Sequence, residues 1–236
     1  MTGDANLPVA LLTASAVAAA VWHYAASRRC RGGSAAGFCL TRVTRNTKGS
    51  GFEWKDPTSI YLDPSTFAAC ICDLEQQLRD RLITDSVDVV AAIDAAGYVV
   101  GAALADRLGT GLLTVRKGGS LPVPTDEVVY SYSKGTGKTM ELRCPAFKPG
   151  TRVVVVDQWV DSGGSMRAAI NLIERQEGVV VGVVALCIED GPSEKKRENA
   201  RWLRGRYPCV TLIQPASDEQ QQCNAHMLVS WQSEKL

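Results

Sequence analysis

The hydrophobic pattern changes character several times after residue 50, and each change predicts an element. Large apolar residues recur at helical spacing from Phe67 to Leu78, and Asp63 and Ser65 stand just before them as candidate caps. Apart from Asp88, residues 87–93 form an apolar run rich in β-branched side chains, which is typical of a buried parallel strand. The pattern therefore predicts a capped helix followed by a buried strand.

The same alternation continues to about residue 213. The pattern predicts helices over 98–108, 164–176 and 192–204, and strands over 112–115, 153–156, 179–188 and 210–213. Strands that alternate with helices favour a parallel sheet covered on both faces. We therefore expect an α/β, Rossmann-like fold, with the main domain over residues 51–214.

Residues 118–137 interrupt this alternation. The segment is polar, rich in Gly, Ser, Pro and Thr, and longer than an ordinary connection. We expect a flexible lid loop here. The stretch from Lys134 to Thr139 resembles the end of a P-loop, but Tyr132 stands where a P-loop has glycine and Pro145 follows soon after, so a nucleoside triphosphatase is not expected.

The two ends of the chain differ from this domain. Residues 5–27 carry no charge, and residues 28–48 hold six basic and no acidic side chains. Two interpretations of residues 1–27 stay open, a soluble or surface helix and a membrane anchor, with membrane contact through residues 7–31 in the second. Residues 28–50 are interpreted as a basic linker and residues 215–236 as a tail. The domain itself is expected to be cytoplasmic.

Charge and metal-ligand content limit the classes of function. The formal net charge is +1, so no global field favours nucleic acid, and no nucleic-acid partner is expected. Eight cysteines include no CxxC pair and only two histidines are present, which argues against a zinc site. The sequence predicts no particular residue as a direct metal ligand.

The most informative stretch runs from Arg152 to Ser165. A run of four valines ends at Asp157, and a short loop with two glycines and two serines then opens a helix. Backbone amides at a helix N-terminus bind anions, and glycine lets the backbone approach a phosphate closely. Asp157 would stand at the carboxyl edge of the sheet, where ligands of α/β proteins collect. The stretch predicts a site for a phosphorylated sugar.

This stretch resembles the signature of the type I phosphoribosyltransferases: an apolar strand, two acidic residues, two variable positions and a Thr-Gly-Gly-Thr-like loop. Asp157 and residues 162–165 match it in register, with serine for threonine. Residues 51–64, 92–105 and 115–122 are similar to segments of the adenine branch, in the same order. The resemblance covers about residues 51–189.

The resemblance implies a fold with a small hood and a lid over the sheet, and an activity. Enzymes of this family are glycosyltransferases that transfer ribose 5-phosphate from phosphoribosyl pyrophosphate (PRPP) to a purine, with Mg²⁺ and release of pyrophosphate. The adenine branch makes AMP in purine salvage, and a homodimer is expected. The implied PRPP-binding residues are Arg116, Lys117, Asp157, Gln158, Asp161, Ser162, Gly163, Gly164 and Ser165. The implied base-binding residues are Phe52, Lys55 and Trp159, and the implied catalytic residues are Asp157 and Asp161.

Four positions depart from the family pattern. Gln158 replaces the second acidic residue, Ala96 an arginine, Ser120 a lysine, and Gly135-Thr136 a Glu-Tyr pair. Removing one charge-stabilising donor typically costs about 3–4 kcal/mol of transition-state stabilisation. A catalytically weak PRPP- or nucleotide-binding regulatory protein therefore stays open as an alternative.

Asp161 supports a third alternative. The adenine branch has a small residue at this position, whereas the hypoxanthine-guanine branch has an aspartate beside the base. A carboxylate there could exchange a proton with the purine. An enzyme for a 6-oxopurine (hypoxanthine, guanine or xanthine) therefore also stays open, as does a solvated loop aspartate with no catalytic role.

Overall fold

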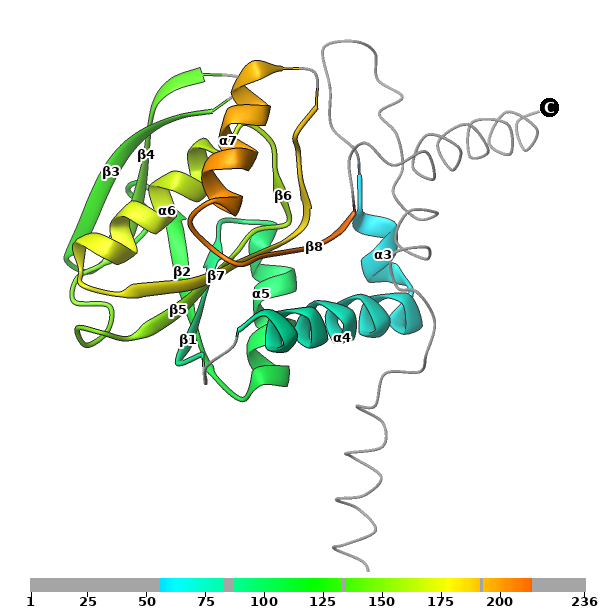
Figure 1. The fold of residues 1–236 in the computed structure, drawn as a ribbon. Coiled ribbons are helices and arrows are strands. Elements are labelled where there is room, and N and C mark those ends of the chain that lie inside the picture. Colours follow the sequence, from blue (N-terminus) through cyan, green and yellow to red (C-terminus); the bar gives the residue numbers. More distant parts are fainter. Residues whose placement is uncertain (1–55, 83–86, 133–134, 192, 214–236) are drawn as a thin grey trace, which may run out of the picture. The chain divides into compact units, whose positions relative to one another are not determined.

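The computed structural model describes residues 56–82, 87–132, 135–191 and 193–213. Their centre is a sheet in which β1 (Val89–Ile93), β2 (Gly111–Lys117), β5 (Arg152–Val156), β7 (Val179–Ile188) and β8 (Cys209–Ile213) run parallel (Figure 1). The strand order is β3-β4-β2-β1-β5-β7-β6, with β8 also paired to β7. The predicted Rossmann-like parallel sheet is confirmed.

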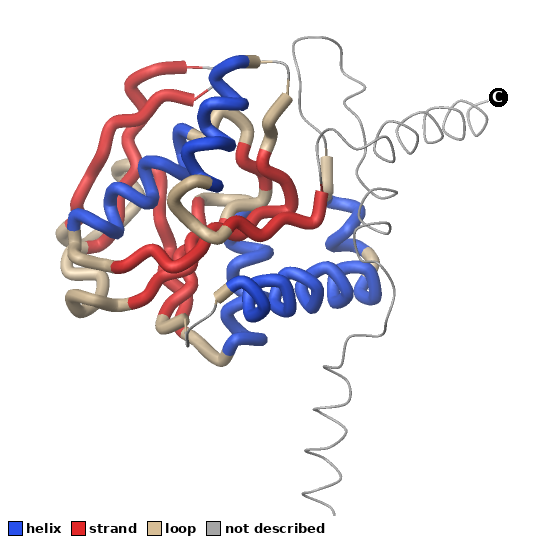
Figure 2. Tube along the Cα trace, viewed as in Figure 1, coloured by secondary structure: helices blue, strands red, loops and turns tan. Residues whose placement is uncertain are grey.

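Helices cover both faces of this sheet, as Figure 2 shows. Alternate valines of β5 point to opposite faces of the sheet. Val154 and Val156 belong to the hydrophobic cluster that includes α4 (Pro64–Arg81) and α5 (Gly97–Leu108). Val153 and Val155 belong to the cluster that includes α6 (Gly164–Arg175) and α7 (Glu194–Arg204). All four valines are fully buried. A strand buried on both faces has a continuous apolar sequence, which is why the four-valine run was a reliable signal.

The predicted helix signals are also present. The Asp63 carboxylate accepts hydrogen bonds from the backbone N–H groups of Ser65 (3.0 Å) and Thr66 (2.9 Å), and so caps α4. A short helix, α3 (Thr58–Leu62), precedes it. Gly109 ends α5 with a left-handed backbone, φ 70°. The first cap fixes where α4 begins, and the second fixes where α5 ends.

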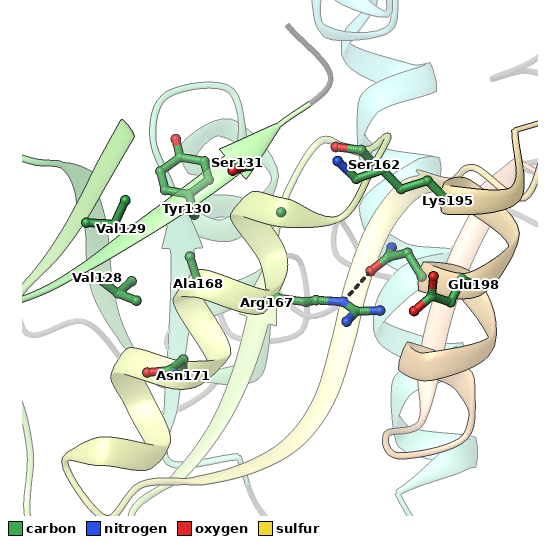
Figure 3. Close-up of a pocket in the computed structure, with 12 residues that line it drawn as sticks. Val128, Val129, Tyr130, Ser131, Ser162, Arg167, Ala168, Asn171, Lys195 and Glu198 are labelled. Carbon is green, nitrogen blue, oxygen red and sulfur yellow. Dashed lines mark hydrogen bonds between the residues drawn. The ribbon is translucent and has the colours of Figure 1, made fainter. Parts of the chain in front are cut away.

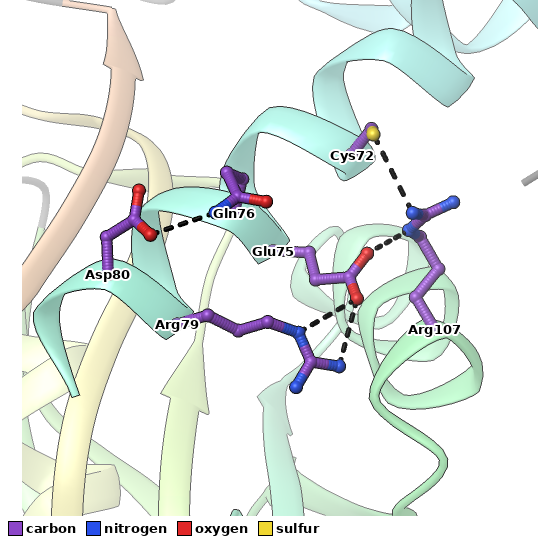
Figure 4. A network of polar contacts seen from close by, with 6 residues as sticks. All are labelled: Cys72, Glu75, Gln76, Arg79, Asp80 and Arg107. Atoms are coloured by element: carbon purple, nitrogen blue, oxygen red, sulfur yellow. Dashed lines mark hydrogen bonds and ion pairs between the residues drawn. The ribbon is translucent and has the colours of Figure 1, made fainter. Parts of the chain in front are cut away.

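A partly buried ionic contact joins α4 to α5 (Figure 4). The Glu75 carboxylate, 13% exposed, binds Arg79 one turn along α4 and Arg107 of α5. A terminal nitrogen of Arg107 also lies 3.6 Å from the Cys72 sulfur. Because α5 begins beside the carboxyl end of β5, this contact helps to hold a helix that borders the pocket described below.

The structure differs from the expectation over residues 118–137. Most of this segment forms an antiparallel hairpin of β3 (Thr125–Tyr132) and β4 (Gly135–Arg143), which extends the sheet beyond β2. Val128 and Tyr130 pack on the core cluster that contains α6, whereas Val129 is 68% exposed. Buried and exposed side chains alternate here, as in a strand with one face in the core. The sequence did not reveal the strand because this alternating stretch is short and lies among turn-forming residues. The two-residue strand β6 (Trp159–Val160) was not predicted either.

The localisation prediction needs correction. None of the helices in the described ranges is both long and apolar enough to cross a membrane. The prediction of a cytoplasmic domain anchored in a membrane is therefore wrong for the part of the chain that the structure describes. Residues 7–31, on which the anchor was predicted, lie outside the described residues, as do residues 214–236.

Candidate functional site

A pocket of about 430 Å³ opens at the carboxyl ends of β1 and β5. Its lining comprises Ile93, Asp94, Ala95, Ala96, Lys117, Tyr130, Lys138 and every residue from Asp157 to Met166. One cavity therefore brings together the predicted loop at residues 162–165 and five other predicted residues: Lys117, Asp157, Gln158, Trp159 and Asp161. Arg116 is not in the lining, and Phe52 and Lys55 lie outside the described residues.

The loop between β6 and α6 has the geometry of an anion cradle. Gly163 caps α6 with a left-handed backbone, φ 77°, and Ser162 is 9% exposed. A β-carbon at residue 163 would overlap the side-chain amide of Asn199, which reaches the loop from α7. Asn199 accepts a hydrogen bond from Arg167 Nε at 3.0 Å. Both the backbone angle and the space therefore require glycine at this position.

Asp157 extends from the end of β5 into the pocket. Desolvation raises the pKa of its carboxyl to about 7, against the lowering effect of hydrogen bonds from the backbone N–H groups of Gln158 and Trp159. The Gln158 N–H to Asp157 distance is 2.7 Å. Gly97 of α5 packs against this turn, where a β-carbon would lie 2.9 Å from the Val156 carbonyl oxygen. Near neutral pH this carboxyl can therefore hold or release a proton.

Gln158 is oriented by a residue that the sequence analysis did not select. Its Nε2 donates a hydrogen bond of 2.7 Å to the hydroxyl of Tyr61 on α3. The Tyr61 ring packs edge-on against Phe67, with centroids 5.4 Å apart. Burial is the main cause that raises the pKa of Tyr61, so the hydroxyl stays protonated. The side chain that replaces the family's second acid is thus held in a fixed direction.

Asp161 and Trp159 are each bound to a neighbouring element. An oxygen of Asp161 lies 2.6 Å from Lys196 Nζ of α7. The indole N–H of Trp159 donates to Glu189 at 3.1 Å. Both residues line the pocket, and each already has a polar partner within the protein.

The turn after β2 is held by a buried carboxylate. Glu141 of β4 is 1% exposed and accepts hydrogen bonds from the backbone N–H groups of Gly119 (3.1 Å), Ser120 (2.6 Å) and Leu121 (2.6 Å). These bonds fix the backbone directly after Lys117, which lines the pocket. Ser120, where the family pattern has a lysine, contributes its backbone amide to this contact.

Asp94, Tyr130 and Lys138 are pocket residues that the site prediction omitted. Asp94 directly follows β1, so the rule that ligands collect at carboxyl ends of strands could have found it. Its carboxylate lies 3.4 Å from Nε of Arg116, so Asp94 connects this arginine to the edge of the pocket although Arg116 is not in the lining. Tyr130 and Lys138 come from the hairpin, whose position relative to the sheet no local sequence pattern predicts.

Comparisons with known proteins agree with this geometry. A family model described as phosphoribosyl transferase domain matches residues 58–219. The adenine phosphoribosyltransferase of Paracidovorax citrulli is 34% identical over 174 residues, which are 73% of this chain and 90% of that protein. That of Chloroflexus aurantiacus is 36% identical over 167 residues, 70% of this chain and 88% of that protein.

Solved structures show the same similarity. The adenine phosphoribosyltransferase of Saccharomyces cerevisiae, solved with an imino-altritol bisphosphate and adenine, has a TM-score of 0.65 at 25% identity and covers 76% of this chain and 98% of its own. That of Rhodothermus marinus has a TM-score of 0.64 at 27% identity, with coverages of 76% and 98%.

Proposed function

The chain belongs to the phosphoribosyltransferase family, and on that premise we propose that it converts adenine and PRPP to AMP and pyrophosphate. The observation that carries the proposal is that the signature loop, Asp157 and Lys117 line one pocket at the carboxyl edge of the sheet. The similar proteins named above are adenine phosphoribosyltransferases, which supports adenine as the acceptor.

The pocket suggests how its residues divide the work. Loop amides at the start of α6 bind the 5-phosphate, because a helix N-terminus favours an anion. Asp157 accepts hydrogen bonds from ribose hydroxyls in its charged form. Lys117 compensates the charge that collects on pyrophosphate as the bond from C1 of the ribose to oxygen breaks. A purine nitrogen then bonds to C1, and the proton that it loses passes to the departing pyrophosphate. Positioning and charge stabilisation supply most of the rate enhancement in such a scheme.

The acidic residues of the pocket fit a Mg²⁺ ion that arrives with PRPP. The described residues include no group of three or more His, Cys, Asp or Glu able to hold a metal alone. Mg²⁺ is commonly bound by one or two carboxylates together with substrate phosphates, and Asp94 and Asp157 line the pocket. They would hold the ion, which neutralises charge on the leaving pyrophosphate.

The ion pair of Asp161 with Lys196 bears on the choice of base. A 6-oxopurine enzyme would need this carboxylate to contact the base, but in the structure one of its oxygens lies 2.6 Å from Lys196 Nζ and is already engaged in an ion pair. The contact therefore supports adenine over a 6-oxopurine. The homodimer implied by the resemblance belongs to the proposal as well.

The base preference is tested with the full chain, PRPP and Mg²⁺, by supplying adenine, hypoxanthine, guanine and xanthine separately and measuring kcat/KM for each. Adenine should be preferred, and Lys196→Met, which frees the Asp161 carboxylate, should narrow that preference. A preference for a 6-oxopurine would replace the adenine proposal with the alternative based on Asp161. PRPP binding without turnover on any base would instead indicate a regulatory protein. The replacement of the family's second acidic residue by Gln158 would then account for the missing activity.

A further inference from the structure

A second cavity, of about 360 Å³, adjoins the first at the phosphate loop (Figure 3). Ser162 and Gly164 line both cavities, and β3, α6 and α7 form the remaining walls. Figure 3 shows Arg167 extending from α6 toward Glu198 of α7, with Lys195 on the side of Ser162. The reaction proposed above leaves this second cavity without a role.

The charges around the cavity are unevenly paired. Four of the basic residues of α7 have acidic partners: Lys196 binds Asp161, Arg197 and Arg201 bind Glu194, and Arg204 binds Asp190. Lys195 forms no such pair within the described chain. Arg167 also lacks a carboxylate partner there, although it lies 4.4 Å over the Trp202 ring and donates from Nε to Asn199. Its direction is thus fixed while its terminal nitrogens are available to a ligand.

A buried amide adds a hydrogen-bond donor. Asn199 lines the cavity and is 1% exposed, and its Nδ2 has no hydrogen-bond partner in the described chain. A buried donor without a partner lowers stability, since it has lost water and gained nothing in return. An acceptor oxygen supplied by a ligand would satisfy it.

We propose that this cavity binds the terminal phosphate of a nucleoside 5′-diphosphate whose first phosphate occupies the loop at residues 162–165. The proposal rests on the proposed function, which places a 5-phosphate in that loop. Two cations and an unpartnered amide N–H present donors, which suit phosphate oxygens. Glu198 is the single carboxylate of the lining, so the balance of charge favours an anion. Such a diphosphate would compete with both PRPP and the monophosphate product.

The test compares the affinities of ADP and AMP for the full chain by titration calorimetry. ADP should bind about tenfold more tightly than AMP, the effect of one additional charge-assisted contact. Lys195→Met should bring the two affinities close together by weakening ADP alone. Glu198→Gln should act in the opposite direction and widen the difference, since it removes the opposing charge.

Two further variants make the result interpretable. Arg201→Met changes a basic residue of the same helix that is 71% exposed and does not line the cavity, so it should leave both affinities unchanged. Arg167→Met should behave like Lys195→Met, with its melting temperature measured because Arg167 packs on Trp202. Equal affinities of wild type for ADP and AMP, or a difference that survives Lys195→Met, would overturn the proposal. Failure to bind AMP at all would instead count against the proposed function.

Discussion

Gly163 and Gly119 offer a matched pair of substitutions, because their φ angles are almost the same and their surroundings are not. Their φ angles are 77° and 76°. A β-carbon at Gly119 would meet nothing within 4 Å, whereas one at Gly163 would overlap the buried amide of Asn199. Alanine at either site incurs the left-handed penalty of about 1–2 kcal/mol. Only Gly163→Ala must also displace a packed side chain.

The size of the additional effect follows from Asn199. Overpacking in a well-packed interior costs about 1–3 kcal/mol, and a hydrogen bond to a charged group such as Arg167 contributes about 1.5–3 kcal/mol. We therefore expect Gly163→Ala to lower the free energy of unfolding by about 3–5 kcal/mol, against about 1–2 kcal/mol for Gly119→Ala. A loss of that size is a large part of the 5–15 kcal/mol, roughly, that stabilises a domain.

Equilibrium unfolding in urea measures both variants under one set of conditions. Adding Asn199→Ala to Gly163→Ala should recover part of the lost stability, because it removes the overlapping atoms. Equal losses for Gly163→Ala and Gly119→Ala would refute the reasoning, since they would show that Asn199 yields its space at no cost. The same variants should differ in PRPP affinity, with Gly163→Ala the weaker binder.

Three further substitutions test separate parts of the site. Glu141→Gln should reduce the free energy of unfolding by about 2–4 kcal/mol in urea titrations, because three backbone N–H donors lose a charged acceptor; an unchanged midpoint would show that the contact is dispensable. The pKa of Asp157 is about 7 in the folded chain against a usual 3.8, so the native state binds a proton that the unfolded chain releases and stability falls as pH rises through 7. Asp157→Asn removes that dependence, and its melting temperature relative to wild type should rise between pH 5 and pH 8.5, whereas a constant difference would contradict the raised pKa. Tyr61→Phe removes the acceptor that orients Gln158 and should weaken PRPP binding about fivefold in calorimetric titrations with little effect on adenine affinity, and equal losses for both ligands would point to a general disturbance instead.

Local sequence patterns predicted the fold and part of the site for an identifiable reason. The strands buried on both faces, such as the four valines of β5, have no alternative place in a folded chain. The loop at residues 162–165 follows β5 so closely that its position at the carboxyl edge is set by chain connectivity. Asp157 could be placed by the same argument.

The remaining pocket residues depend on contacts between distant segments. Lys138 and Tyr130 reach the pocket because a hairpin folds beside β2, and Tyr61 meets Gln158 across 97 positions of sequence. Asn199 fills the space beside Gly163 from a helix that lies outside the signature. Neither periodicity nor a local motif contains this information, which arises only when the sheet and its helices are assembled.

The most direct test of the central claim is the stoichiometry of products from adenine and PRPP. The full chain is incubated with both substrates and Mg²⁺, and AMP and pyrophosphate are quantified together over time. The account predicts that the two products form in equal amounts, and that Asp157→Asn and Ser165→Ala both slow their formation. Absence of AMP, or AMP formation that neither substitution affects, would contradict the assignment of this pocket as the site of phosphoribosyl transfer.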